Sequence, residues 1–162
     1  MLKELNIIDK GTKVSISSAI NVCDNTMERY VKVAIDMCRC VVIVVDSEGR
    51  DPNEVKKIVV EEHVKGFATD LSRIRIVVAH PCMEAWLCEL MDLKSCELGT
   101  FRDVIHAIER VLGGKYDKKM LPKLVMKWLR EKINHKNPSL NELPNQLREL
   151  LNTIINCLSQ SP

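Results

Sequence analysis

The chain has 162 residues, of which 46% are hydrophobic, and its 24 basic and 22 acidic residues give a formal net charge of +2. This length and apolar content predict one globular domain with a hydrophobic core and argue against disorder. The near balance of charge excludes a polybasic nucleic-acid binder that works by bulk charge, so any contact with phosphate has to be local.

The seven cysteines lie in apolar segments rather than in loops, and no signal peptide or long apolar span accompanies them. We therefore expect a reduced, cytoplasmic protein without a membrane partner. Disulfides of the kind found inside hyperthermophiles are the alternative that composition leaves open. No two cysteines have the Cys-x-x-Cys spacing of a zinc site.

Residues 1–39 are predicted to form a helix, a strand and a second helix. Residues 1–11 have apolar side chains at helical spacing and end at Lys10-Gly11, which indicates the last turns of a helix. Residues 13–23 alternate apolar and small polar side chains, as an edge or near-edge strand does. Residues 25–39 place their apolar side chains on one helical face.

The central strand is predicted over residues 40–45, where the five consecutive β-branched side chains of residues 41–45 favour a strand buried on both faces. It is followed by the acidic turn Asp46-Ser-Glu48-Gly49. Asp51-Pro52 then supplies an N-cap and a first-turn proline, so a helix begins there and ends near Gly66.

A second core strand is predicted over residues 73–80, and Pro81 is expected to open the next helix, which carries Glu84 and Trp86. Strand, helix, strand, helix in this order predicts βαβ units with a parallel sheet. The fold class is therefore α/β, a small and mainly parallel sheet flanked by helices.

Beyond Asp92 the pattern predicts helices only, so the C-terminal half is helical. Thr100 and Asp103 form a capping box for a helix that closes at Gly113-Gly114, and two more helices are expected over residues 121–133 and 144–158. The last helix has a narrow apolar seam, which favours packing on the body of the protein or on a partner helix. A homodimer through these helices is one expectation.

Three carboxylates are expected to converge at one edge of the sheet. Asp46 and Glu48 follow the first core strand, Glu84 follows the second, and parallel strands end on the same edge. Like charges so close raise one another's pKa, and Mg²⁺ or Mn²⁺ relieves the repulsion. The alternatives are an ordinary polar turn at residues 46–49 and, for Glu84, a glutamate that complements a helix dipole.

Two motifs carry a resemblance to a known family. Asp46-Ser-Glu48-Gly49 and Met83-Glu84-Ala-Trp86 resemble those of a family of uncharacterised Toprim-like proteins, which is related to the nuclease domains of the OLD family. The resemblance covers residues 12–92 and extends more loosely through Tyr116-Asp-Lys-Lys119. It implies a Toprim-like core over residues 12–92 with a helical extension over 93–162, a Mg²⁺ site at the acidic turn, and phosphodiester chemistry.

Asp46, Glu48 and Glu84 are the predicted metal ligands, of which the resemblance implies Asp46 and Glu48. Glu84 and Lys119 are the candidate catalytic residues. Lys119 or Arg50 would offset phosphate charge. Trp86 is expected to be a packing residue.

The chain departs from the Toprim pattern at one point, because residues 1–11 supply no glutamate-bearing first strand. A truncated chain, a degenerate member and a site completed by a partner are the alternatives. Two functions follow: a metal-dependent nuclease that acts on nucleic acid, or an interaction module that kept the fold and lost catalysis.

Overall fold

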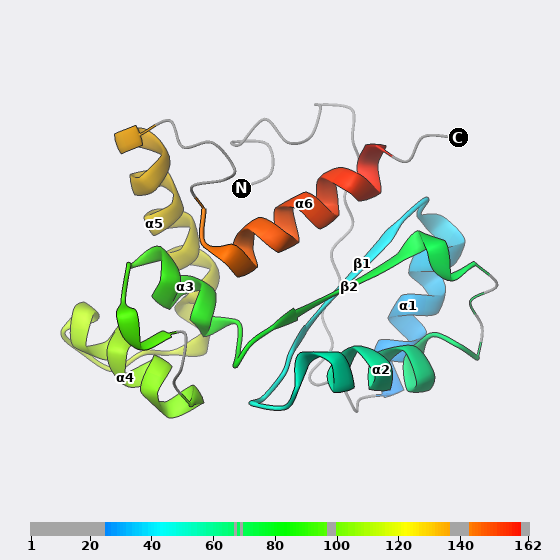
Figure 1. Cartoon of the computed structure of the whole chain (residues 1–162), viewed down its shortest axis with the longest axis horizontal. Coiled ribbons are helices and arrows are strands. Elements are labelled where there is room, and N and C mark those ends of the chain that lie inside the picture. Colours follow the sequence, from blue (N-terminus) through cyan, green and yellow to red (C-terminus); the bar gives the residue numbers. More distant parts are fainter. Residues whose placement is uncertain (1–24, 67, 69, 97–99, 137–142, 160–162) are drawn as a thin grey trace. The chain divides into compact units, whose positions relative to one another are not determined.

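Two parallel strands, β1 (Val41–Asp46) and β2 (Ile74–Ala79), pair with each other and are flanked by helices (Figure 1). The computed structural model describes residues 25–66, 68, 70–96, 100–136 and 143–159. The helix expected over residues 1–11 and the strand expected over residues 13–23 lie outside this part of the chain. Within it, the predicted α/β class with a small parallel sheet flanked by helices is confirmed.

Helices make up most of the described residues. They are α1 (Asn25–Met37), α2 (Pro52–His63), α3 (Glu84–Leu90), α4 (Phe101–Leu112), α5 (Leu121–Lys136) and α6 (Asn145–Ser159), together with the short 3₁₀ turns η1 (Leu71–Arg73), η2 (Lys94–Cys96) and η3 (Lys118–Met120). The predicted helical C-terminal half is confirmed, and α2 begins at Pro52 as its N-terminal signals predict.

The chain forms two compact units. The first contains the described residues up to Val45, residues 53–78 and the part of α6 from Leu150 onward, and the second contains residues 46–52 and 79–149. The strand-ending residues Asp46 and Ala79 therefore belong to the second unit. The expectation of a single domain stays a prediction.

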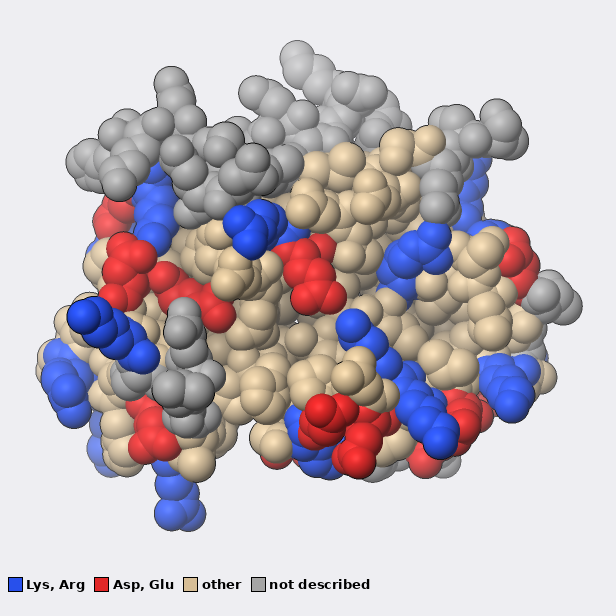
Figure 2. All heavy atoms as spheres, viewed as in Figure 1, with Lys and Arg blue, Asp and Glu red and all other residues tan. Residues whose placement is uncertain are grey.

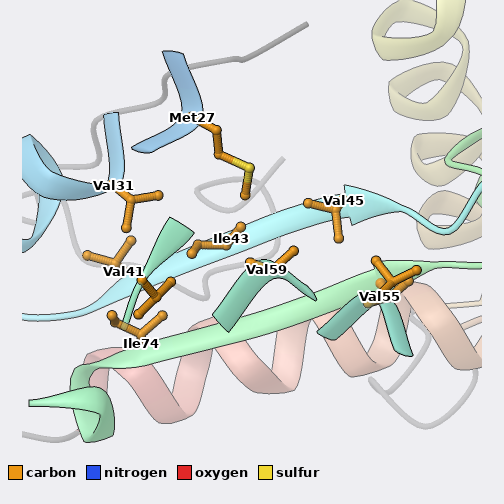
Figure 3. Close-up of a cluster of buried hydrophobic side chains, with 10 residues drawn as sticks. Met27, Val31, Val41, Ile43, Val45, Val55, Val59 and Ile74 are labelled. Atoms are coloured by element: carbon orange, nitrogen blue, oxygen red, sulfur yellow. The ribbon is translucent and has the colours of Figure 1, made fainter. Parts of the chain in front are cut away.

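The core of the first unit is built on one face of β1. Val41, Ile43 and Val45 point to this face, where they pack with buried side chains of α1 and α2 such as Val31 and Val59 (Figure 3). The alternate residues of β1 are only half-buried. The β-branched run forms the predicted strand, and the second of its two faces is buried only in part.

Backbone carbonyl oxygens at the C-terminal end of α1 accept hydrogen bonds from an arginine that lies directly before β2. The Arg73 guanidinium donates hydrogen bonds to the carbonyl oxygens of Arg39 at 3.0 Å and Ile35 at 2.9 Å, and also to that of Cys38. These carbonyls have no partner within the helix, so the guanidinium satisfies acceptors that would otherwise need water. Arg73 thereby fixes α1 against the start of β2.

The second unit has its own apolar core, formed by α3, α4, α5 and η2. Its most buried side chains include Leu87, Val104, Ile108 and Leu124. The predicted capping box of α4 is present, since Thr100 and Asp103 each accept a hydrogen bond from the other's backbone N–H. Gly113 closes the helix with φ of +67°, a left-handed conformation that glycine adopts without the steric cost of a Cβ.

Four of the cysteines form disulfides. Cys40, beside the start of β1, is bonded to Cys157 near the end of α6, and Cys88 of α3 is bonded to Cys96 of η2. The expectation of a reduced protein is therefore wrong for these four residues. Each pair joins segments that the fold brings together, which cysteine spacing does not reveal.

None of the helices in the described part of the chain is both long and apolar enough to cross a bilayer.

Candidate functional site

The turn after β1 is held against the residues that follow β2. The backbone N–H of Ser47 donates to the carbonyl oxygen of Ala79 at 2.9 Å, and that of Gly49 donates to the carbonyl oxygen of Pro81 at 3.3 Å. Glu48 and Gly49 have φ values of +51° and +81°, so the chain turns through two left-handed residues. Glycine suits the second of these because it has no Cβ to clash.

The next helix begins three residues later than predicted. Pro81 follows a cis peptide bond, and α3 starts at Glu84 rather than at Pro81. The carbonyl oxygen of Pro81 faces the β1 turn, where it accepts hydrogen bonds from the Ser47 hydroxyl at 3.1 Å and from the Gly49 N–H. It is therefore engaged in joining the two strand ends instead of receiving the first hydrogen bond of a helix.

Asp46 occupies the centre of this strand-end region. Its Oδ1 accepts a hydrogen bond from the backbone N–H of Met83 at 2.7 Å, and its Oδ2 lies 3.5 Å from the Lys118 ammonium. Burial raises the pKa of Asp46 above its ordinary value of 3.8, and the nearby Glu84 carboxyl raises it further. Lys118 and the Met83 hydrogen bond act in the opposite direction without cancelling these effects.

Glu84 is completely buried at the start of α3. Its Oε1 accepts a hydrogen bond from the Tyr116 hydroxyl at 3.4 Å, but its Oε2 has no hydrogen-bond partner among the residues that the structure describes. A buried carboxyl oxygen without a partner is costly, because water no longer solvates it. The Cys82 thiol is a neighbouring hydrogen-bonding group of this carboxyl, and an added donor or a cation at Oε2 would offset the cost.

The Glu84 carboxyl raises the pKa of two neighbouring side chains. Burial, and next the Glu84 carboxyl, raise the pKa of the Cys82 thiol to about 12. The same two causes raise the pKa of Tyr116. Both groups therefore stay protonated at neutral pH, so Cys82 is not a nucleophile here and Tyr116 serves as a hydrogen-bond donor to Glu84.

The structure brings together two of the three predicted acids. Asp46 and Glu84 interact electrostatically, whereas the Glu48 side chain is 65% exposed and lies 3.6 Å from the Arg50 guanidinium. No group of three His, Cys, Asp or Glu side chains within the described residues is placed to hold a metal ion. The assignment of Glu48 as a third ligand stays a prediction.

Lys118 is the lysine that contacts Asp46, and the predicted role of Lys119 in offsetting phosphate charge stays a prediction. The backbone N–H of Lys119 donates to the Asp117 carboxylate at 2.9 Å, which caps η3, and its side chain is exposed. The sequence predicted that Lys118 and Lys119 lie near the acids, but it could not show which of them contacts Asp46. That choice depends on the conformation of η3. Tyr116 belongs to the Tyr116-Asp-Lys-Lys119 segment of the resemblance, but the sequence did not predict its hydrogen bond to Glu84.

The sequence also did not predict a network of buried polar groups beside the turn at residues 46–49. The Ser47 hydroxyl is fully buried, lies 2.9 Å from Nδ1 of His80 and donates to the Pro81 carbonyl. Gln146 of α6 brackets the His80 backbone, donating to its carbonyl oxygen at 2.7 Å and accepting from its N–H at 2.8 Å. These contacts fix the strand ends, and a hydroxyl so enclosed is a structural group rather than a nucleophile.

Trp86 is 9% exposed and lies inside α3, which confirms its predicted role in packing. The tryptophan of the Met-Glu-Ala-Trp motif therefore positions the helix that carries Glu84.

The raised pKa of Asp46 predicts a pH dependence of stability in the absence of divalent cations. A carboxyl whose pKa is higher in the folded than in the unfolded state stabilises the fold fully below its unfolded pKa, and this contribution is lost as pH rises through the folded pKa. We expect Asp46→Asn to gain stability relative to the parent as pH rises from about 4 to about 7 in EDTA, measured by urea denaturation.

Asp103 provides a control of opposite sign. Its hydrogen bonds with Thr100 lower its pKa, so its contribution is present above pH 3.8 and is lost as pH falls. Asp103→Asn should therefore lose stability relative to the parent as pH rises through the range below about 4, and should differ from the parent by a nearly constant amount from about 4 to about 7. A difference between Asp46→Asn and the parent that stays constant with pH would contradict the prediction for Asp46.

No model of a protein family, no curated protein and no solved structure matches the chain.

Proposed function

We propose that the chain binds a divalent cation, Mg²⁺ or Mn²⁺, through Asp46 and Glu84 and acts on phosphodiester bonds. The observation that carries this proposal is the buried Oε2 of Glu84, which has no hydrogen-bond partner among the described residues and lies beside a second acid whose pKa is raised. Two acids in one buried region repel each other, and a hard cation relieves that repulsion.

The number of acids fits this type of cation. Mg²⁺ is commonly bound by one or two carboxylates, with waters and substrate phosphate oxygens as its other ligands. Asp46 and Glu84 therefore suffice, and Glu48 remains a candidate third ligand. The resemblance of the Asp-Ser-Glu-Gly and Met-Glu-Ala-Trp motifs to those of Toprim-like proteins supports the same assignment.

Each neighbouring side chain has a role in this proposal. A bound cation supplies charge that polarises a phosphate oxygen and lowers the pKa of an attacking water. Tyr116 orients Glu84 by donating to its Oε1, and the Met83 N–H holds Oδ1 of Asp46. Lys118 brings positive charge to the place where phosphate would bind.

Nucleic acid is the proposed substrate, bound by local contacts. Figure 2 shows basic and acidic side chains interspersed over the face in view, in keeping with the net charge of +2. The exposed lysines next to the site, Lys115, Lys118, Lys119 and Lys123, are the groups available for phosphate. Lys119 is thereby proposed as a phosphate contact rather than as a partner of Asp46.

An interaction module without catalysis is the second candidate. It is favoured by the absence of a three-residue metal group within the described part of the chain. Its proposed form is a homodimer through the C-terminal helices. The seam of α6 argues against this form, because Leu147, Leu150 and Leu151 are already buried within the chain itself.

Thermal unfolding with and without millimolar Mg²⁺ or Mn²⁺ tests the proposal. A cation at about ten times its Kd should stabilise the parent by about 1.4 kcal/mol, which raises Tm by about 3 to 6 °C for a chain of this size. Asp46→Asn and Glu84→Gln should abolish the shift, whereas Glu28→Gln, an exposed acid of α1, should keep it. Glu48→Gln decides whether a third ligand exists.

A matching assay follows cleavage of single-stranded and double-stranded DNA and RNA with each cation, using the same variants. If neither cation changes the Tm of the parent, the cation site is refuted. If the cation binds but no nucleic acid is cleaved, the site is retained and the interaction module becomes the better function.

A further inference from the structure

The segment from Tyr116 to Lys118 contacts both acids of the proposed site. The Tyr116 hydroxyl donates to Oε1 of Glu84 at 3.4 Å, and the Lys118 ammonium lies 3.5 Å from Oδ2 of Asp46. The segment is anchored at each end. The N–H of Tyr116 donates to the Glu109 carboxylate at 3.0 Å, and Asp117 caps η3 through the Lys119 N–H.

These contacts leave one oxygen of each acid for a cation. Oδ1 of Asp46 is held by the Met83 N–H and Oε1 of Glu84 by the Tyr116 hydroxyl, so Oδ2 and Oε2 remain. Oε2 has no hydrogen-bond partner among the described residues, whereas Oδ2 is the oxygen that Lys118 contacts. An ammonium and a divalent cation compete for that oxygen, because their charges repel each other at such a distance.

We propose that Lys118 is a built-in counter-ion of the site, which a divalent cation has to displace from Asp46. The inference rests on the proposed function, since it concerns the same pair of acids. The lysine side chain is 65% exposed and its contact with Asp46 is long, so the ion pair is weak and exchangeable. Lys118 thus lowers the affinity of the site for the cation but does not prevent the cation from binding.

Titration calorimetry with Mn²⁺ and with Mg²⁺ tests the exchange on the full chain. Lys118→Met should bind the cation about fivefold more tightly than the parent, the equivalent of a surface ion pair of about 1 kcal/mol. Lys119→Met is the matched control, because it removes the same charge one residue away from a lysine that does not contact Asp46. Its affinity should stay within about twofold of the parent value.

A second measurement follows the lysine itself. Amine labelling read out by mass spectrometry should modify Lys118 faster when Mn²⁺ is present, while Lys119 serves as the internal reference. Adding Asp46→Asn to Lys118→Met should remove the tighter binding, because the oxygen in competition is gone.

The outcomes separate the inference from the function on which it rests. Equal affinities for the parent and Lys118→Met, with no change in labelling, overturn the exchange but leave the cation site intact. Tighter binding by Lys118→Met than by the parent, together with faster labelling of Lys118 in the presence of Mn²⁺, supports the exchange. Absence of binding by every variant, or binding that survives Asp46→Asn, overturns both proposals.

Discussion

Replacing both Cys40 and Cys157 with serine is expected to lower the free energy of unfolding by about 5 kcal/mol. The disulfide joins residues 117 positions apart, so its loss releases a very long loop in the unfolded chain. In the chain-entropy treatment the cost of closing a loop grows with the logarithm of its length. This is a large part of the stability of an ordinary domain, which is about 5 to 15 kcal/mol.

The second disulfide gives an internal comparison. Cys88 and Cys96 are 8 positions apart, so replacing both with serine should cost only about 2.5 kcal/mol by the same treatment. Cys38, which is free and half-buried, is the control for a cysteine-to-serine change without a disulfide.

Guanidinium denaturation under non-reducing conditions, together with a count of free thiols by alkylation and mass, measures these effects. If the parent chain purified under oxidising conditions has seven free thiols, the disulfide assignment fails. If the two double variants lose equal stability, loop length is not the cause.

Leu151→Ala is expected to destabilise the protein by about 2 to 5 kcal/mol, because the side chain is fully buried and its removal leaves a cavity. Leu158 provides a matched control on the same helix. It is 41% exposed, so the same substitution there should cost about 1 kcal/mol or less. Both changes replace a leucine of α6 with alanine, so the difference between them reports mainly burial.

Urea denaturation of the two variants gives this difference directly. Light scattering adds a test of the proposed homodimer. If Leu158→Ala converts a dimer to a monomer while Leu151→Ala only lowers stability, α6 contributes its exposed residue to a partner. Equal losses of stability at the two positions would contradict the burial argument.

Local signals in the sequence predicted the strands and most of the helices of the described residues, although not the start of α3. The β-branched run over residues 41–45 forms β1, Pro52 begins α2, and Thr100 and Gly113 begin and end α4. Each of these signals acts within one element, through rotamer preference, a fixed φ, a side-chain cap or a left-handed glycine. The acids after the strands could be predicted to meet because parallel strands end on one edge.

The side chains that surround those acids were decided by tertiary structure. Lys118 contacts Asp46 across 72 positions, Tyr116 contacts Glu84 across 32, and Gln146 contacts His80 across 66. Such contacts depend on how α4, η3 and α6 lie against the strand ends, and no periodicity within one segment contains that information. For the same reason the disulfide partners could not be assigned from cysteine spacing.

The helices and strands could be predicted because they follow from local conformational preference. The position of Asp46 and Glu84 at one edge could be predicted because the two strands are parallel. Only the tertiary structure decided that Glu48 turns outward, that Glu84 is fully buried with one oxygen lacking a partner in the described chain, and that Lys118 contacts Asp46. Burial and partner choice are properties of the packed chain, and they set the charge balance on which the proposed cation site depends.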